Sequence, residues 1–388
     1  MAADQSSNKE GAFDGRQIGR QSRMTKETKN SGLNSAKDAK KDEFYTQLSD
    51  IEKELKHYKK HFKGKVVYCN CDDPRVSNFF HYFSYNFERL GLKKLIATCY
   101  KSQDVDLFSD AKSEQAICLE YEGDKNGNRV PDLEKIGIKE LKGDGDFRSN
   151  ESIELLKQAD IVVTNPPFSL FRDYVKQLVD YDKKFLIIGN INAVTTKEIF
   201  PLIEKNKVWL GPSIKSGDRE FGVPDSYPLN AAGSRIDENG KKFIRVKGVR
   251  WFTNLDFKER HEDLILYREF SDAHFPKYDN YDAIDVGVTK DIPFDYNGVM
   301  GVPITFLDKH NPDQFDIVGI AKTWYGAATK KYPKQIQVSK AGSRKEVSKL
   351  NDQPAIKVDK APSNQTFYEV DGEYYVATYV RILIKRRQ

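Results

Sequence analysis

The chain has 388 residues, enough to bury a full hydrophobic core, and its length predicts two domains with a tail. Its net charge of +5 is uneven: residues 1–41 carry +4, residues 321–388 carry +8, and the residues between them carry −7, so we expect the basic end to bind a polyanion. The spacing of the four cysteines suits neither a zinc site nor a disulfide framework, which argues against a zinc-dependent protein. The sequence has no apolar run of transmembrane length and no signal-like start, which argues against membrane-spanning and secreted proteins. These features together predict a cytoplasmic protein.

Residues 1–40 are rich in Ser, Asn, Gly, Lys and Gln and poor in apolar side chains. This composition is typical of disorder, because it offers too little apolar surface to fold around. We interpret these residues as a disordered tail that serves as a spacer rather than as a DNA-binding arm.

Order is predicted to begin at Asp42, in the stretch Asp42-Glu43-Phe44-Tyr45-Thr46-Gln47, and a helix follows it. Ser49 and Glu52 have the spacing of a capping box, which predicts the start of this helix. Gly64 is expected to end it. Its buried face is predicted to contain four apolar residues at helical spacing, namely Ile51, Leu55, Tyr58 and Phe62.

The strand predicted at residues 66–69 ends in the polar segment Asn70-Cys71-Asp72-Asp73, and a helix is expected from about residue 77 to residue 90. A polar turn between a strand and a helix is where a doubly wound fold binds a nucleotide-like ligand. The glycine fingerprint of a dinucleotide site and the phosphate-binding loop are both absent, so a ligand without phosphates fits better. S-adenosylmethionine is one, with its cationic centre near Asp72 or Asp73. The alternative is that the two aspartates only turn the chain.

A second polar strand end is predicted at residues 141–147. It follows residues 101–137, to which we assign no function and in which Asn126-Gly127 indicates a hairpin. The Asp146 carboxylate can accept a hydrogen bond from an adenine amino group while Phe147 packs on the ring. The alternative is an ordinary Gly-Asp-Gly turn.

The apolar run Ile161-Val162-Val163 predicts a strand buried on both faces, and it stops at Asn165-Pro166-Pro167-Phe168. An amine on a nucleobase is a poor nucleophile, because its lone pair is delocalised into the ring. Two acceptors, the Asn165 side-chain oxygen and the Pro166 carbonyl oxygen, would draw on its hydrogens and free that lone pair. The prolines would hold both acceptors in place beforehand, and Phe168 would offer a face to the base. The alternative is a plain turn, because Asn-Pro also marks turns.

The α/β pattern continues to about residue 256. Helices are predicted at residues 170–181 and 196–205, and strands at residues 185–188, 208–210 and 249–254. Between them, residues 212–248 form a polar excursion rich in Gly and Pro, in which Asn239-Gly240 indicates a hairpin. Beyond about residue 257 the alternation fades, and aromatic, Pro and Asn segments dominate.

Residues 322–345 contain seven basic residues and no acidic residue, with three aromatic residues among them. This mixture suits contacts with a nucleic-acid backbone together with stacking on bases. The alternative is a solvated lysine-rich loop. The residues predicted to bind DNA are Lys322, Lys330, Lys331, Lys334, Arg344 and Lys345.

Several of these motifs resemble one enzyme family. Asn165-Pro166-Pro167-Phe168 resembles the catalytic tetrapeptide of methyltransferases that act on the amino group of adenine. Asp146-Phe147 resembles the motif before it, and Phe44-Tyr45-Thr46 resembles the N-terminal cofactor motif of these enzymes. Longer stretches are similar to the EcoRI-type adenine-specific DNA methyltransferases, namely residues 65–80, 143–171 and 278–306. The similarity spans roughly residues 38–318 and returns at residues 381–385.

The resemblance implies an α/β fold with a Rossmann-like S-adenosylmethionine-dependent methyltransferase domain and a C-terminal mixed target-recognition region. It implies a catalytic domain at residues 41–256 and DNA recognition at residues 257–388, with a basic insertion at residues 320–378 that departs from the family. It also implies flipping of the target adenine out of the duplex. Catalytic roles carry over to Asn165, Pro166, Pro167 and Phe168. Cofactor-binding roles carry over to Phe44, Tyr45, Thr46, Cys69, Asn70, Asp72, Asp73, Asp146 and Phe147.

The resemblance implies double-stranded DNA as a partner, and a cognate restriction endonuclease that acts in the same system without stable contact. No membrane partner is implied, and a monomer is favoured. An RNA or protein (glutamine) amino-methyltransferase with the same loop remains an alternative. A non-catalytic DNA-binding module is a second one, against which the intact loop argues. The insertion leaves the target sequence open. The acidic residue that usually follows the second strand is replaced by Cys99-Tyr100, so the ribose contact is unassigned.

Overall fold

The computed structural model describes residues 44–71, 73–100, 116–123, 137–225, 227–229 and 233–387. The predicted tail at residues 1–40, the predicted hairpin at Asn126-Gly127 and the predicted cofactor residue Asp72 lie outside the described residues. Within the described part, no helix is long and apolar enough to cross a membrane.

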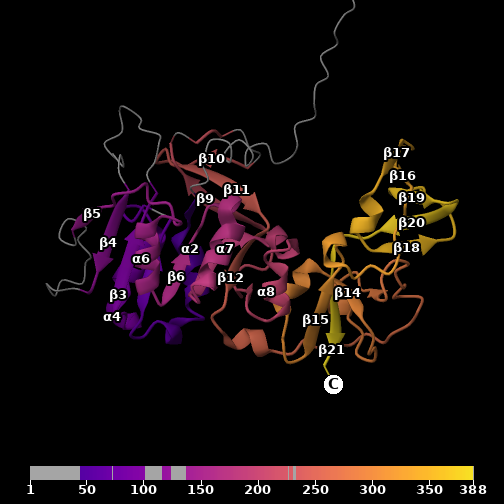
Figure 1. The fold of residues 1–388 in the computed structure, drawn as a ribbon, viewed down its shortest axis with the longest axis horizontal. Helices are drawn as coiled ribbons and strands as arrows, with labels where there is room; N and C mark the ends of the chain where they lie inside the picture. Colours follow the sequence, from indigo (N-terminus) through magenta and orange to yellow (C-terminus); the bar gives the residue numbers. More distant parts are fainter. Residues whose placement is uncertain are drawn as a thin grey trace, which may run out of the picture.

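An eight-stranded sheet forms the centre of the N-terminal half, in the order β5-β4-β3-β2-β6-β7-β12-β8 (Figure 1). The four strands from β3 to β7 are parallel, whereas β4 and β12 run antiparallel to their neighbours. The strands are β2 (Val66–Cys69), β3 (Lys94–Thr98), β4 (Ile117–Tyr121), β5 (Ile138–Glu140), β6 (Ile161–Thr164), β7 (Lys184–Asn190), β8 (Trp209–Leu210) and β12 (Val249–Thr253).

Helices cover both faces of this sheet, because its strands bury side chains on both. Val162 of β6 joins one core with α6 (Asn150–Gln158) and α7 (Phe171–Asp180), and α8 (Phe200–Glu204) extends this layer. Ile161 and Val163 point the other way and join a second core. That core contains α2 (Leu48–Leu55), α3 (Asn78–Tyr85) and α4 (Phe87–Leu90). The prediction of a doubly buried strand is confirmed.

The strand order reverses at β2. The chain passes from β2 to its neighbour β3 on one side, and later returns to β6 on the other side. A crevice forms at such a reversal, outside the carboxyl ends of the strands. The ends of β2 and β6 therefore lie next to each other at the expected ligand-binding edge.

The capping box predicted at Ser49 and Glu52 is wrong. The backbone carbonyl of Gln47 already accepts from the amides of Asp50 and Ile51, so α2 begins at Leu48 and no side chain caps it. The apolar face is correct, because all four predicted residues are fully buried. The α-helix ends at Leu55 and not at the predicted Gly64, and Tyr58 and Phe62 flank a 3₁₀ turn at Lys59–His61.

The predicted excursion at residues 212–248 folds into a small antiparallel sheet in the order β1-β9-β11-β10. The hairpin prediction is confirmed, since β10 pairs with β11 and Gly240 adopts a positive φ of 79° at the turn. The edge strand β1 comes from the start of the described residues. The strands are β1 (Tyr45–Thr46), β9 (Asp218–Val223), β10 (Arg235–Ile236) and β11 (Lys242–Lys247).

The C-terminal region contains strands and 3₁₀ turns but no α-helix among its described residues, in agreement with the predicted end of the α/β alternation. One sheet has the order β13-β14-β21-β15, and its core is continuous with that of α7 and α8. Its strands are β13 (Ile284–Asp285), β14 (Met300–Pro303), β15 (Phe315–Ile320) and β21 (Arg381–Arg386).

A separate five-stranded antiparallel sheet, in the order β17-β16-β19-β20-β18, lies between β15 and β21 in the sequence. Because β15 and β21 are paired neighbours, this five-stranded unit extends from one end of that strand pair. The unit has a small hydrophobic core of its own. Figure 1 shows it at the opposite end of the molecule from β4 and β5. Its strands are β16 (Gln335–Val338), β17 (Arg344–Val347), β18 (Ala355–Val358), β19 (Phe367–Val370) and β20 (Glu373–Ala377).

Glu54 gives the fold a measurable pH dependence. Its buried carboxylate accepts from the Tyr58 hydroxyl and the Ser213 amide, and burial raises its pKa to about 7. A raised folded pKa means that stability is fully present below the unfolded pKa and is lost as pH rises toward 7. We expect Glu54→Gln to remove this loss, so that the variant gains stability relative to wild type from about pH 5 to about pH 8, by roughly 2–3 kcal/mol at most. Urea unfolding across this range measures it, and parallel curves for both proteins would contradict it.

Candidate active site

The tetrapeptide predicted to be catalytic, residues 165–168, lies at the carboxyl end of β6, against the end of β2. The Thr164 hydroxyl donates to the Asn70 carbonyl oxygen, and the Tyr174 hydroxyl of α7 donates to the Asn70 side-chain oxygen. Asn70 and Asn165 are each 5% exposed. Asn70, predicted to bind the cofactor, is therefore hydrogen-bonded to the residue that directly precedes Asn165.

The orientation of the Asn165 side chain is fixed by its neighbour. Its Nδ2 donates to the backbone carbonyl of Phe44 at 2.6 Å. A carbonyl oxygen only accepts, so the nitrogen must face Phe44 and the oxygen must face away. This Oδ1 is buried and accepts no hydrogen bond from any described residue. A buried acceptor without a donor indicates a site that a ligand donor completes.

Phe168 belongs to an aromatic cluster that sequence analysis did not find. Its ring lies 5.6 Å from Phe44 and 6.4 Å from Phe221, and Phe44 also lies 5.9 Å from Phe221 and 6.1 Å from Tyr227. Phe221 and Tyr227 come from the excursion, which has no local sequence signal that links it to residue 168. The half-buried Phe168 ring closes the exposed side of this cluster.

The predicted cofactor motif at residues 44–46 also contacts the loop at residues 165–168. Besides the Phe44 contacts, Thr46 is buried and its backbone carbonyl accepts from Asn78 Nδ2 at 2.7 Å. The Thr46 hydroxyl is buried and has no partner among the described residues. Tyr45 and Thr46 are held by pairing with β9.

Two predicted acidic cofactor residues form the same local structure. Asp73 Oδ1 accepts from the amide of Arg75, and the Arg75 guanidinium bonds both carboxylate oxygens. Asp146 does the same with Arg148. The guanidinium of an arginine two residues along the chain therefore balances the charge of each aspartate.

The loop that contains Asp146 approaches the end of β3 closely. Gly145 has a φ of +76°, and a Cβ there would lie 2.2 Å from the Cys99 carbonyl oxygen, so only glycine fits. Phe147 is buried 5.0 Å from Tyr174, with the Arg148 guanidinium over its ring. The loops after β2, β3 and β5 thus meet at one edge, with Cys69 and Asn70 buried at the end of β2.

The six cations predicted to bind DNA divide into two groups. Lys322 pairs with Asp352, Lys330 with Asp279, and Arg344 with Glu369. The side chains of the second group are exposed and form no ion pair with any described residue; they are Lys331, Lys334 and Lys345.

Asp279 and its neighbour Asn280 attach the five-stranded unit to the body of the protein. Asp279 Oδ2 accepts from Lys330 Nζ and the Tyr332 hydroxyl, each at 2.6 Å. The Asn280 side chain bonds the backbone at Gln353 and Ala355. Lys330 therefore has a structural partner.

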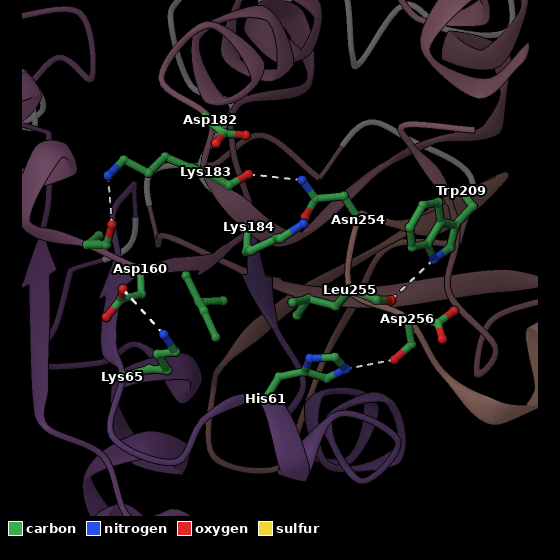
Figure 2. Close-up of a pocket in the computed structure, with 12 residues that line it drawn as sticks. His61, Lys65, Asp160, Asp182, Lys183, Lys184, Trp209, Asn254, Leu255 and Asp256 are labelled. Atoms are coloured by element: carbon green, nitrogen blue, oxygen red, sulfur yellow. Dashed lines mark hydrogen bonds and ion pairs between the residues drawn. The ribbon is translucent and has the colours of Figure 1, made fainter. Parts of the chain in front are cut away.

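A cavity of about 590 Å³ lies at the opposite edge of the central sheet, at the amino ends of β2, β6 and β7 (Figure 2). Three of its polar side chains have partners within the protein: Lys65 pairs with Asp160, His61 bonds the Asp256 carbonyl, and Lys183 bonds the Ala159 carbonyl. It contains none of the predicted site residues, and we assign it no part in catalysis.

Comparison with known proteins links this geometry to a family. A family model described as adenine-specific methyltransferase EcoRI matches residues 32–387. The chain is 54% identical over 301 residues to the Type II methyltransferase M.EcoRI of Escherichia coli, across 77% of this chain and 92% of that protein. It is 41% identical to M.MgeORF184P of Mycoplasma genitalium (74% of this chain, 85% of that protein) and 39% identical to M.MpnI of Mycoplasma pneumoniae (74% and 84%), both Type II methyltransferases. No solved structure matches the chain significantly.

Proposed function

Because this chain belongs to the EcoRI family of adenine-specific methyltransferases, we propose that it transfers a methyl group from S-adenosylmethionine to the exocyclic amine of adenine in duplex DNA. The observation that carries the proposal is the buried Asn165 Oδ1, an acceptor without a donor. An amine hydrogen is the donor that this oxygen lacks.

The chemistry required of the protein is modest. Asn165 Oδ1 and the Pro166 carbonyl oxygen accept hydrogen bonds from the adenine amine and thereby localise its lone pair. Both acceptors belong to a loop fixed by two prolines, Pro166 and Pro167, so they need no reorganisation during the reaction. Phe168 stacks on the base, which must leave the duplex to reach the loop.

The residues around the crevice suit S-adenosylmethionine in one respect that is observed directly. The Thr46 hydroxyl is buried and lacks a partner among the described residues, as expected for a group that binds a polar ligand. S-adenosylmethionine supplies an electrophilic methyl group when bound. Phe44 to Thr46, Cys69, Asn70, Asp73, Asp146 and Phe147 would hold it, with Asp73 and Asp146 exchanging or sharing their arginine partners. The reversal of strand order at β2 supports a Rossmann-like domain.

We assign catalysis to residues 41–256 and DNA recognition to residues 257–388. In the second part, the exposed group Lys331, Lys334 and Lys345 contacts phosphates, whereas the paired group holds the five-stranded unit together. Phosphate contacts position a protein on DNA without reading its sequence. The biological role is protection of DNA within a restriction-modification system whose endonuclease acts separately, and the enzyme acts as a monomer in the cytoplasm.

Neutralising the exposed cations is expected to weaken DNA binding generally. The triple substitution of Lys331, Lys334 and Lys345 by alanine should lower affinity for specific and random DNA alike. It should also reduce the slope of log K against log salt by about 0.9 for each lost contact. Fluorescence anisotropy at several salt concentrations measures both effects.

A charge-matched control is the triple alanine variant of Lys60, Lys65 and Lys184, which lie at the edge of the sheet opposite to the catalytic loop. Its affinity and slope should equal those of wild type. If the triple variant of Lys331, Lys334 and Lys345 behaved like this control, these lysines would be solvated side chains without a DNA contact.

The function itself is tested by incubating the protein with labelled S-adenosylmethionine and duplex DNA, RNA or a protein extract. We expect label only in DNA, at adenine after nuclease digestion, and single-molecule sequencing of the product to reveal the target sequence. Label in RNA or in protein glutamine, with none in DNA, would refute the proposal.

A further inference from the structure

We propose that Phe221 of β9 is a positioning residue for the catalytic amide: through Phe44 it fixes the carbonyl group that orients the Asn165 side chain. The assignment rests on the proposed function and adds to it a residue from the excursion at residues 212–248. Phe221 touches neither the reacting amine nor the methyl donor in this account. It acts only through its neighbours.

The backbone contacts place Phe44. The strand β1 consists of Tyr45 and Thr46 alone, and it is held at the edge of its sheet by pairing with β9, where Thr46 lies opposite Phe221. On the other side, Asn78 of α3 donates to the Thr46 carbonyl oxygen at 2.7 Å. The Phe44 carbonyl lies one residue before this short strand, so the pairing with β9 sets its position.

Contacts between aromatic rings also hold the Phe44 side chain in place. Phe221 is 1% exposed and packs 5.9 Å from the Phe44 ring and 6.4 Å from the Phe168 ring. Replacing it by a smaller side chain leaves a void beside both rings. Phe44 can then move relative to Asn165.

A small movement matters because, among the described residues, the bond to Phe44 alone orients the amide. Asn165 Nδ2 donates to Phe44 at 2.6 Å, and this bond aims Oδ1 into the site. When Phe44 shifts, the amide loses its fixed orientation and Oδ1 no longer meets the amine at a defined place. Misplacement of a reacting group by about 1 Å can lower a rate by about 10²-fold.

The test compares Phe221→Leu with Phe243→Leu. Phe243 lies on the neighbouring strand β11, where its ring contacts Arg235 and not the aromatic cluster. We expect Phe221→Leu to lower the single-turnover methylation rate at saturating DNA and S-adenosylmethionine about 10- to 100-fold. Phe243→Leu should keep the wild-type rate. Equal rates in the two variants would overturn the inference while leaving the proposed function intact.

A double-mutant cycle separates positioning from general loosening. Asn165→Asp lacks the Nδ2 donor, so the Phe44 carbonyl has nothing to hold in that variant. Phe221→Leu should therefore lower the residual rate of Asn165→Asp hardly at all, because the effects of a positioning residue and its target are not additive. An equal fold-loss in both backgrounds would show that Phe221 acts independently of Asn165.

A third measurement needs no substrate. The side-chain amide signals of Asn165 can be assigned by nuclear magnetic resonance from their loss in Asn165→Asp. In ligand-free Phe221→Leu we expect these protons to exchange with water faster than in wild type and in Phe243→Leu. Unchanged exchange would overturn the inference even if the chain proved inactive on DNA, which would be a separate failure of the proposed function.

Discussion

Asn165→Ala is expected to lower the rate constant of methyl transfer by about 10²- to 10³-fold, with the affinity for S-adenosylhomocysteine nearly unchanged. The substitution removes the acceptor that the protein holds ready for the amine, while Thr46 and Asn70 remain in place. Single-turnover methylation at saturating DNA and S-adenosylmethionine measures the chemical step. The affinity is measured separately by calorimetry.

Stability should respond to the same substitution very little. Asn165→Ala breaks the bond to Phe44, worth about 1 kcal/mol, but it also removes a buried oxygen that no described residue satisfies. These two terms have opposite signs. We therefore expect a urea unfolding curve close to that of wild type, so that a loss of activity reflects chemistry and not unfolding.

Asn254→Ala is the matched control for this variant. The Asn254 amide also bonds the backbone, since its Oδ1 accepts from the Phe185 amide and its Nδ2 donates to the Lys183 carbonyl, at the opposite end of β7. Both polar atoms of the Asn254 amide form hydrogen bonds, so Asn254→Ala should lose stability while its methylation rate stays that of wild type. Wild-type turnover in Asn165→Ala would refute the catalytic assignment.

The location of the loop at residues 165–168 was predictable because its signal is local. An apolar β-branched run indicates a buried strand and Asn-Pro-Pro ends it; both features are confirmed, because β6 is buried throughout and ends at Thr164. The contact of Asp73 with Arg75, and that of Asp146 with Arg148, also has a local sequence signal from which it could have been predicted. Asp73-Pro74-Arg75 and Asp146-Phe147-Arg148 share the spacing at which an aspartate accepts from the second following amide, which places the arginine beside it.

The orientation of Asn165 and the aromatic cluster were not predictable from local patterns. Phe44, Phe168 and Phe221 meet through strand pairing between distant segments, and no periodicity within any one segment indicates its partner. The ion pairs of the basic stretch were not predictable for the same reason. Its sequence contains no anion, yet three of its cations find acidic partners elsewhere in the fold, among them Asp279 and Asp352.

Breaking the buried ion pair between Arg250 and Asp308 should destabilise the protein more than any other change considered. Arg250 lies on β12 of the central sheet, and Asp308 lies in the 3₁₀ turn that precedes β15. Each side chain is 4% exposed, and the guanidinium also donates to the carbonyls of Lys215 and Val249. Arg250→Ala leaves a buried carboxylate without its cation, so we expect a loss of about 3–5 kcal/mol in the free energy of unfolding, measured in urea.

Replacing both partners should cost far less than removing one. Burial raises the pKa of Asp308 even though the neighbouring guanidinium opposes this, so desolvation outweighs the attraction within the pair. An apolar pair of similar volume avoids that penalty, and Arg250→Met with Asp308→Leu should recover most of the stability lost in Arg250→Ala. The contact would then join the central sheet to the C-terminal region by shape rather than by charge. If the double variant were as unstable as Arg250→Ala, the ion pair itself would contribute net stability at this contact.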